Sequence, residues 1–580
     1  MSSRSVFNAE SGAARSASGL EREPSRWLAQ DAFATRAVIA LGVVVFFFHL
    51  GSYGLWEPDE ARYAEIGREM LALGNFIVPH LNYVPYIEKP PLLYWLTALC
   101  FKMFGLNELA ARLVPALSGL GTVTATFFFV RRTFDRRRAM LAAAILTTAP
   151  IFAVMAQVLT TDMLLTAMTT VALYALFIHY LDGGWWCWIA YFAMAAATLT
   201  KGPVGMALPV ASMAVFLWWE GELRGAIRRF HALAGFLVMV AIVAPWFVAI
   251  SLKEPGFVDF YFVGEYLKRA LVPSYSHEEP FYYYVPVIVG GLLPWSVLVP
   301  FLTWRRMSPN PARRYCFAAS ATIIGLFSLA SAKLIPYVLP AFPPLAVLIA
   351  DGVASCAWPD EELSGRPGAP DSRILKEVGP LISLTGVGAI LVAILAPMFR
   401  SPYPMAVRPA LYGIGAVAVA GGAAMTFAFL MRKPGAGLTL LVLTLAGALL
   451  VGSWARLEAE PLRSYAQLSR EVARRAPDAT LICYRRYVQS LPFYTHRRVI
   501  LVGPETELTY GAHHSKDAAG YFLKTDAQML RLWSQPRPTV LVIDASDLAR
   551  LKPKLGAFTV IGSEHTKRAV LNRDERLAGN

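Results

Sequence analysis

Long apolar segments are the feature of this sequence that most restricts its fold. Of the 580 residues, 56% are hydrophobic and only 16% are charged, whereas soluble domains average about 25% charged residues. About 20 consecutive apolar residues cross the hydrocarbon layer of a bilayer as a helix, which satisfies its own backbone hydrogen bonds. The chain repeats such segments along most of its length. The sequence therefore predicts a polytopic α-helical membrane protein.

Basic clusters indicate how these segments cross the membrane, because Lys- and Arg-rich loops stay in the cytoplasm. The clusters lie in the N-terminal tail and at 131–138, 224–229, 305–314 and 432–433. They share one side only if the segment 91–106, which begins at the second proline of Pro90-Pro91, lies in the outer interface. We therefore expect thirteen transmembrane helices, at 37–55, 110–130, 139–157, 163–181, 185–200, 203–219, 231–252, 283–304, 314–331, 334–350, 377–397, 409–430 and 437–455.

This topology divides the chain into three parts. Residues 1–36 form a cytoplasmic tail, 37–455 the transmembrane domain, and 456–580 a periplasmic domain. The outer loops of the transmembrane domain are 56–109 and 253–282. Shorter apolar runs in the tail predict strands at 480–484, 498–502 and 539–543, and helices near 462–473 and 525–533. Alternating helices and strands indicate a small α/β domain that stabilises or gates the membrane domain.

Charged residues concentrate in the first outer loop. Six carboxylates and three cations lie between Glu57 and Lys89, and ionisable groups beside a bilayer are candidates for function. Asp59 directly follows the first expected transmembrane helix. Asp162 is the last residue of the link that follows the third one. For a single loop acid such as Asp59, the alternative is a solvated charge that helps to orient the protein.

Two lysines on the same side suit a phosphate ligand. Lys89 precedes two prolines, and Pro90 favours an extended backbone at Lys89, which positions its ammonium group. Lys201 is followed by Gly-Pro. A lysine ammonium binds phosphate as a point charge.

These segments carry a family resemblance. Glu57–Tyr63, Tyr86–Leu92, Asp162, Lys201–Pro203 and His277–Tyr284 resemble the corresponding parts of the GT-C superfamily of polyprenyl-phosphate-dependent glycosyltransferases. The chain is most similar to the bacterial lipid A 4-amino-4-deoxy-L-arabinose transferases (the ArnT/PMT-like family), and more distantly to protein O-mannosyltransferases. The resemblance covers about 37–455 and extends in architecture to the tail.

The resemblance implies an inverting transfer of 4-amino-4-deoxy-L-arabinose from undecaprenyl phosphate to a lipid A phosphate, at the periplasmic face of the inner membrane. It implies catalytic roles for Asp59 and Asp162. The residues expected to bind substrate or phosphate are Arg62, Tyr63, Tyr86, Lys89, Lys201, Arg269, Lys333 and Tyr337. For Lys333 and Tyr337, a snorkelling lysine and an interfacial tyrosine are the alternative.

Acceptor chemistry bears on the role of Asp59. A phosphomonoester has a second pKa near 6, so a lipid A phosphate is already nucleophilic at neutral pH and needs no base. A protein hydroxyl acceptor would need one. We therefore expect Asp59 to position the sugar and to stabilise positive charge developing at the anomeric carbon. Proton abstraction is its secondary role.

No cofactor is required by this chemistry. Glu88 and His277 are candidate ligands for a divalent cation, zinc or magnesium. We expect a monomer that contacts membrane lipids and no nucleic acid. Two other functions fit part of the sequence: transfer of mannose or another hexose to protein or to a different lipid, and lipid flipping or transport. A transporter is expected to place its charges at the bilayer midplane, whereas these gather at the outer interface.

Overall fold

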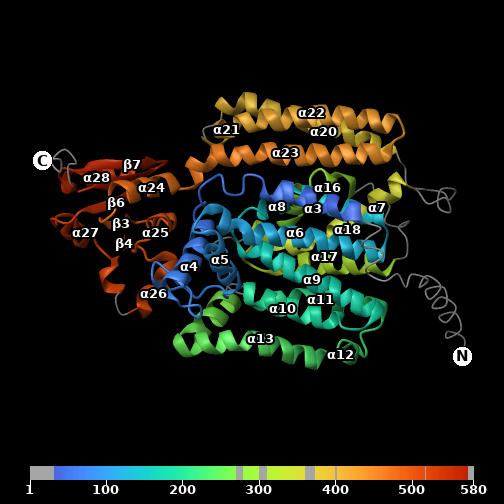
Figure 1. The fold of residues 1–580 in the computed structure, drawn as a ribbon, viewed down its shortest axis with the longest axis horizontal. Coiled ribbons are helices and arrows are strands. Elements are labelled where there is room, and N and C mark those ends of the chain that lie inside the picture. The colour runs from blue at the N-terminus through green and yellow to red at the C-terminus, as the bar shows by residue number, and fades with distance from the viewer. Residues whose placement is uncertain are drawn as a thin grey trace, which may run out of the picture.

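The computed structural model describes residues 32–268, 279–299, 310–358, 373–398, 402–515 and 518–572. It consists of a large helical domain and a smaller domain with a central sheet at the C-terminal end (Figure 1). The predicted architecture, a polytopic helical protein with a C-terminal α/β domain, is confirmed. The candidate residues Arg269 and His277 lie outside the described residues.

The helical domain contains sixteen principal described segments, connected in places by α12 (Ala226–Arg229), η1 (Asp259–Lys268), η5 (Ala396–Met398) and α21 (Pro402–Ala406). The principal segments are α3 (Ala32–Phe47), α6 (Glu108–Thr133), α7 (Arg136–Thr148), α8 (Pro150–Met155), α9 (Thr161–Asp182), α10 (Trp186–Lys201), α11 (Val204–Glu220), α13 (Ala232–Lys253), α15 (Tyr284–Gly291), α16 (Trp295–Leu298), α17 (Pro311–Leu329), η4 (Ile335–Ala341), α18 (Phe342–Ala357), α20 (Arg373–Leu395), α22 (Arg408–Leu430) and α23 (Pro434–Arg463).

Within the described residues, seven helices are long and apolar enough to cross a membrane. Each of the thirteen expected spans overlaps at least one helix, but several are shorter or interrupted: the third, for example, is divided into α7 and α8 at Pro150. The first, expected at 37–55, ends at Phe47. The count of thirteen spans stays a prediction.

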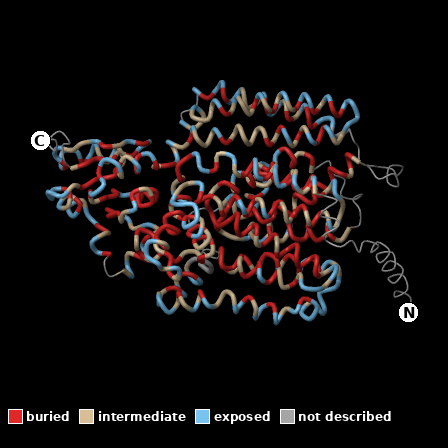
Figure 2. Tube along the Cα trace, viewed as in Figure 1, coloured by how far each residue is buried: buried red, intermediate tan, exposed pale blue. Residues whose placement is uncertain are grey.

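Burial separates the central helices from the peripheral ones. In α9 and in the η4–α18 segment, 78% and 89% of the most apolar window is buried, against 22% in α13 and 28% in α23. Figure 2 shows the same pattern, with buried residues concentrated in the middle of the helical domain. The peripheral helices are apolar on faces that no described protein segment covers, as expected for helices that contact lipid.

Between α3 and α6, the first outer loop forms two helices and a short hairpin. They are α4 (Asp59–Leu73), α5 (Leu92–Phe104), and the strands β1 (His80–Leu81) and β2 (Val84–Pro85). At 1.5 Å per residue the 13-residue α5 is about 20 Å long, too short to cross a bilayer. It packs against α4 and α6, at the end of the helical domain that adjoins the C-terminal domain (Figure 1).

The C-terminal domain contains a six-stranded sheet in the order β5-β4-β3-β6-β8-β7. The strands are β3 (Thr480–Tyr484), β4 (Val499–Val502), β5 (Phe522–Leu523), β6 (Thr539–Asp544), β7 (Thr559–Glu564) and β8 (Lys567–Leu571). Strands β3, β4, β5 and β6 are parallel to one another, β8 is antiparallel to β6, and β7 is antiparallel to β8. The helices are α24 (Ala466–Arg475), α25 (Ser490–Thr495), α26 (Thr509–His514), α27 (Asp526–Trp533) and α28 (Ala545–Leu555).

The boundary between the domains differs from the expected one. Helix α23 continues to Arg463, so the expected division after residue 455 falls inside a helix. The helix expected near 462–473 begins only at Ala466, after a break at Ser464. The apolar pattern ends at 455 because the last two turns of α23 carry charged residues, Arg456, Glu458, Glu460 and Arg463, although the backbone stays helical.

The outer loop and the C-terminal domain share one hydrophobic core. Its buried members include Tyr63 of α4, Leu93 of α5, Leu468 of α24, Leu491 of α25 and Val499 of β4. The two parts are therefore packed as a single unit.

Candidate active site

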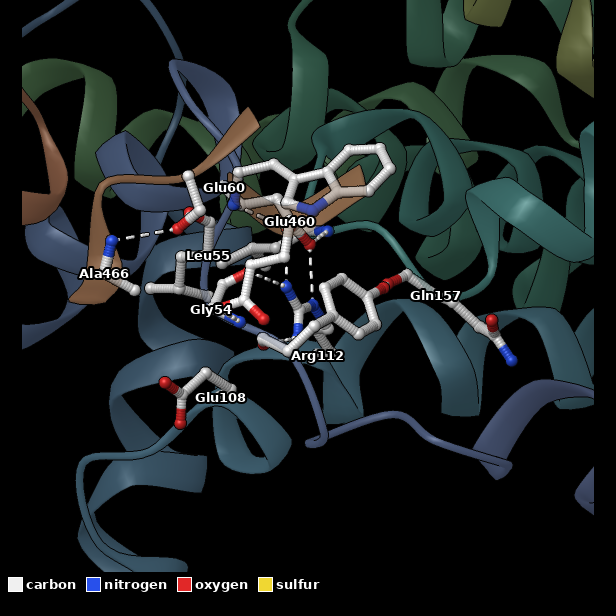
Figure 3. Close-up of polar contacts among 12 residues, drawn as sticks. Gly54, Leu55, Glu60, Glu108, Arg112, Gln157, Glu460 and Ala466 are labelled. Atoms are coloured by element: carbon white, nitrogen blue, oxygen red, sulfur yellow. Dashed lines mark hydrogen bonds and ion pairs between the residues drawn. The ribbon is translucent and has the colours of Figure 1, made fainter. Parts of the chain in front are cut away.

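A buried ion pair holds the first outer loop in place. Arg112 of α6 donates from Nε to Glu60 Oε1 at 2.8 Å and from Nη2 to Glu60 Oε2 at 2.7 Å (Figure 3). Its remaining donors reach the carbonyl oxygens of Leu50, Tyr53 and Gly54 at 2.9–3.1 Å. Both charged side chains are almost completely buried.

Glu60 also accepts hydrogen bonds from two backbone amides. The donors are Trp56 N and Leu159 N, each at 3.0 Å. One carboxylate thus ties the segment before α4 to α6 and to the link before α9. This fixes the relative positions of Asp59 and Asp162, which flank the two tethered segments.

The C-terminal domain binds the same loop. The Glu57 carboxylate accepts hydrogen bonds from the backbone N–H groups of Gln489, at 3.1 Å, and Ser490, at 2.8 Å, at the start of α25. Asn82 and the backbone of Val499 exchange two hydrogen bonds of 2.9 and 2.8 Å. A helix N-terminus is a favourable place for a carboxylate, so Glu57 connects the loop to the domain.

Asp59 and Arg62 occupy the first turn of α4. Arg62 Nη1 lies 3.4 Å from Asp59 Oδ1, and Nη2 lies 2.5 Å from Glu507 Oε2. Glu507 comes from the C-terminal domain and also accepts a hydrogen bond from Gln489 Nε2 at 2.7 Å. The Asp59 side chain is 54% exposed, whereas Arg62 is 15% exposed. Arg62 is thus held between two carboxylates, and Asp59 faces solvent.

Three buried tyrosines, Tyr63, Tyr86 and Tyr94, lie near Arg62. Tyr86 Oη donates to Glu88 Oε2 at 2.7 Å, and the rings of Tyr63 and Tyr94 pack 5.9 Å apart. Burial raises the pKa of Tyr63, and the Asp59 carboxylate raises it further. All three tyrosines are buried, so they stay protonated at neutral pH.

Asp162 and Lys201 form a second ion pair. Lys201 Nζ, at the end of α10, lies 2.5 Å from Asp162 Oδ1, in the first turn of α9. The ammonium also lies 4.2 Å from the centre of the Tyr337 ring. Asp162 is close enough to Tyr63 to affect it electrostatically, as are Asp59 and Glu88. The two parts of the site are therefore neighbours.

The remaining lysines are placed differently. Lys89 Nζ donates to the carbonyl oxygen of Glu88 at 3.1 Å, which leaves it beside Tyr86 and Glu88. Lys333 is buried and donates to the carbonyl oxygen of Glu279 at 2.8 Å. Lys333 therefore anchors the chain at Glu279, while Tyr337 reaches the site through Lys201.

The expected metal site is only partly visible. Glu88 lies in the site and accepts the Tyr86 hydroxyl, but its proposed partner His277 is not described. Among the described residues, no three His, Cys, Asp or Glu side chains group in a way that could hold a metal ion. Metal binding stays a prediction.

The structure thus brings eight of the expected residues together around α4, α9 and α10: Asp59, Arg62, Tyr63, Tyr86, Glu88, Asp162, Lys201 and Tyr337. Sequence reasoning missed Glu60, Arg112 and Glu507. A lone arginine in the apolar segment 108–130 was a signal for Arg112. The sequence contained no such signal for Glu507, because this residue lies in a domain with no recognisable motif.

In the transfer from a lipid-linked sugar donor that the family resemblance implies, replacing Glu507 with Gln is expected to weaken donor binding and to raise KM for the donor by about 10-fold, because Arg62 loses its closest charged partner. Glu505→Gln is the matched control: Glu505 lies two residues earlier and contacts the exposed His513 instead. Steady-state kinetics of both variants measure the effect. An equal KM in both would show that Glu507 does not set the position of Arg62.

Glu57 is expected to make the domain contact sensitive to pH. Burial raises the pKa of Glu57 from 4.5 to about 7, against the opposing effect of its hydrogen bonds. In this window the folded protein binds a proton that the unfolded chain does not, so stability falls as pH rises from about 4.5 to about 7. The slope is at most about 1.4 kcal/mol per pH unit. Thermal unfolding of the parent and of Glu57→Gln at several pH values tests this. If Glu57 does not titrate between pH 4.5 and 7, the difference in stability between the two proteins should not change with pH.

Two family descriptions match parts of this chain. Residues 88–248 match the dolichyl-phosphate-mannose-protein mannosyltransferase family, and residues 468–572 match the aminoarabinose transferase C-terminal domain. The first range contains Lys89, Asp162 and Lys201, and the second contains Glu507.

Similar proteins cover nearly the whole chain. The undecaprenyl phosphate-α-4-amino-4-deoxy-L-arabinose arabinosyl transferase of Shewanella sediminis is 27% identical over 91% of this chain and 97% of its own length. The protein of that name from Aeromonas salmonicida is 30% identical over 67% of this chain and 70% of its own length. The crystal structure of ArnT from Cupriavidus metallidurans bound to undecaprenyl phosphate superimposes with a TM-score of 0.82, at 26% identity, and the match covers 95% of this chain and 99% of that one.

Proposed function

This chain belongs to the undecaprenyl phosphate-α-4-amino-4-deoxy-L-arabinose arabinosyl transferase family, and on that basis we propose that it transfers 4-amino-4-deoxy-L-arabinose from undecaprenyl phosphate to a phosphate of lipid A. The enzyme is a membrane-bound glycosyltransferase. We place it in the inner membrane, with the site and the C-terminal domain in the periplasm, because the basic clusters then stay in the cytoplasm. We propose that it acts as a monomer.

The single observation that carries this proposal is the site itself. Two carboxylates, Asp59 and Asp162, stand beside the cations Arg62 and Lys201 at the end of the helical domain. A lipid-linked sugar donor needs both kinds of group: cations for the phosphate that leaves, and a carboxylate for the positive charge that develops at the anomeric carbon.

The roles follow from this arrangement. In the proposed reaction an oxygen of the acceptor phosphate attacks the anomeric carbon from the face opposite the carrier, forming a new C–O bond as the bond to undecaprenyl phosphate breaks. The configuration at carbon is therefore inverted. Undecaprenyl phosphate leaves with the electron pair, and Lys89, Arg62 and Lys201 stabilise its negative charge. Asp59, the more exposed carboxylate, faces the sugar, while Asp162 holds Lys201.

Mass spectrometry of lipid A tests the proposal. Lipid A from cells that express the protein should carry added pentosamine mass on its phosphates, and lipid A from cells without it should not. Hexose mass on a protein or another lipid would instead favour the mannosyltransferase alternative, which the family match at residues 88–248 supports.

Lys89→Ala is expected to weaken binding of undecaprenyl phosphate by about 10-fold and to reduce turnover, because the ammonium contacts the phosphate before and after it leaves. Lys102→Ala is the matched control, since Lys102 is an exposed lysine of the neighbouring α5. Carrier binding to the purified proteins in nanodiscs measures the effect. If Lys89→Ala binds the carrier as tightly as the parent, the phosphate site lies elsewhere among Arg62, Lys201, Arg269 and Lys333.

A further inference from the structure

A cavity lies next to the segment that leads into α4. Its volume is about 380 Å³, and its walls come from α3, α7, α8, α22, α23, the segment before α4 and the link after α8. The lining residues are Val45, Trp56, Thr148, Pro150, Ala153, Val154, Gln157, Ile414, Leu445, Ala448, Leu449, Gly452, Ser453 and Arg456. It shares none of them with the eight site residues around α4, α9 and α10, nor with Lys89.

Two hydrogen-bond donors in this cavity lack acceptors. Trp56 Nε1 and Arg456 Nε are both shielded from solvent, and neither has a hydrogen-bond partner among the residues that the structure describes. A buried donor without an acceptor is costly, and a buried charge more so. The two donors together therefore indicate a site that an anion completes.

The surrounding charges do not supply that anion. The Arg456 guanidinium lies 5.6 Å from the centre of the Tyr53 ring, and the Arg112 guanidinium lies 3.8 Å from the same centre. Glu60 is the nearby carboxylate, but both of its oxygens already accept hydrogen bonds from Arg112. The other acid of this network, Glu460, accepts a hydrogen bond from the Gly54 N–H at 2.8 Å (Figure 3). Among the described residues, neither carboxylate therefore supplies an acceptor for Arg456 Nε.

The rest of the cavity suits an acyl chain. Val45, Val154, Ile414 and Leu449 make most of its wall apolar, and Val154 is 43% exposed on the outside of the helical domain. Arg456, its basic residue, lies two turns before the C-terminal end of α23, and that end of the helix adjoins the C-terminal domain (Figure 1). A cationic end and an apolar slot together fit the phosphate and the chain of an anionic lipid.

We propose that this cavity binds the phosphorylated acceptor lipid, with a phosphate on Arg456 and Trp56 Nε1 and an acyl chain between α8 and α23. The assignment rests on the proposed function, because an enzyme with two anionic lipid substrates needs two phosphate sites. The Lys89 and Lys201 cluster serves the carrier. Trp56 lies three residues before Asp59. An acceptor phosphate bound to Trp56 is therefore close, along the chain, to the carboxylate that we assign to the sugar.

Arg456→Gln and Trp56→Phe test the site. The first removes the cation, and the second removes the indole N–H together with the five-membered ring and keeps a smaller aromatic ring. Arg463→Gln is the matched control, because Arg463 lies two turns further along α23, is exposed and does not line the cavity. Steady-state kinetics with lipid A are combined with native mass spectrometry of the purified proteins, using lipid A, its dephosphorylated form and undecaprenyl phosphate as probes.

Arg456→Gln is expected to raise KM for lipid A by about 10-fold or more, and Trp56→Phe by less. Retention of lipid A should fall in both variants, whereas undecaprenyl phosphate binding should match the parent. Arg463→Gln should match the parent in every assay. The parent should retain lipid A better than its dephosphorylated form, and this difference should disappear in Arg456→Gln.

Three results would overturn the proposal. An unchanged KM and unchanged lipid A retention in Arg456→Gln would show that the cavity holds no acceptor. Loss of undecaprenyl phosphate binding instead would assign the cavity to the carrier. Phosphate-dependent retention through Arg456 in a parent that does not modify lipid A would make the cavity a site for an anionic lipid that is not the acceptor; in that case it is the proposed function that fails.

Discussion

Replacing Asp59 with Asn is expected to lower the rate of sugar transfer by about 10²–10³-fold while the protein stays folded. Asp59 is the exposed carboxylate of the site, and its contact with Arg62 is loose, at 3.4 Å. Its charge is therefore available to the sugar. Because the amide keeps the shape of the side chain and loses the charge, the variant should bind the carrier normally and fail in the chemical step. Transfer assays with purified protein measure the loss.

Asp182→Asn serves as the control for this result. Asp182 is a similarly exposed carboxylate, paired with Arg132 at the other end of α9. That variant should keep parental activity. Near-normal lipid A modification by Asp59→Asn would show that Asp59 is a solvated loop charge, and Asp162 would then become the carboxylate that acts on the sugar.

Replacing Glu60 with Gln is expected to reduce the free energy of unfolding by about 3–5 kcal/mol, because it leaves Arg112 buried without a compensating charge. In this variant the two segments that Glu60 tethers, before α4 and before α9, should also be held less firmly in place. Thermal unfolding in detergent, followed by tryptophan fluorescence, measures the change.

A second substitution tests whether the loss of stability comes from the unpaired charge of Arg112. Adding Arg112→Met to Glu60→Gln removes the orphaned cation, so the double variant should recover part of the lost stability. Glu222→Gln is the control, because Glu222 pairs with Arg229 at the surface, where both side chains are 43% exposed, and surface pairs contribute little. A Glu60→Gln variant as stable as this control would contradict the role of the buried pair.

Much of the architecture could be predicted from the sequence. Apolar length located the helices, and short alternating runs located β3, β4 and β6. Asp162 and Lys201 were expected separately, from their places at the ends of neighbouring segments, and the structure pairs them. The helix ends were less predictable: α23 passes through charged residues, where hydropathy no longer reports on the backbone.

The site residues that sequence reasoning missed make contacts with residues far away in the sequence. Glu60 and Arg112 are 52 positions apart, and Glu507 reaches Arg62 from the other domain. Periodicity describes one helix or strand at a time, so it cannot pair residues across such separations. Asp59 and Glu60 show the difficulty most clearly: they are adjacent acids in sequence, yet one is exposed and the other is buried.

The shared core of the outer loop and the C-terminal domain determines which pieces can be exchanged between related enzymes. Val499 bonds to Asn82, Ser490 to Glu57, and Leu491 packs in the same core as Leu93. A chimera that takes its C-terminal domain from one parent and residues 56–104 from another would join two surfaces that were never selected to fit. The exchangeable unit is therefore discontinuous in sequence: the loop and the domain must be transplanted together, and a graft of either alone is expected to give an unstable protein.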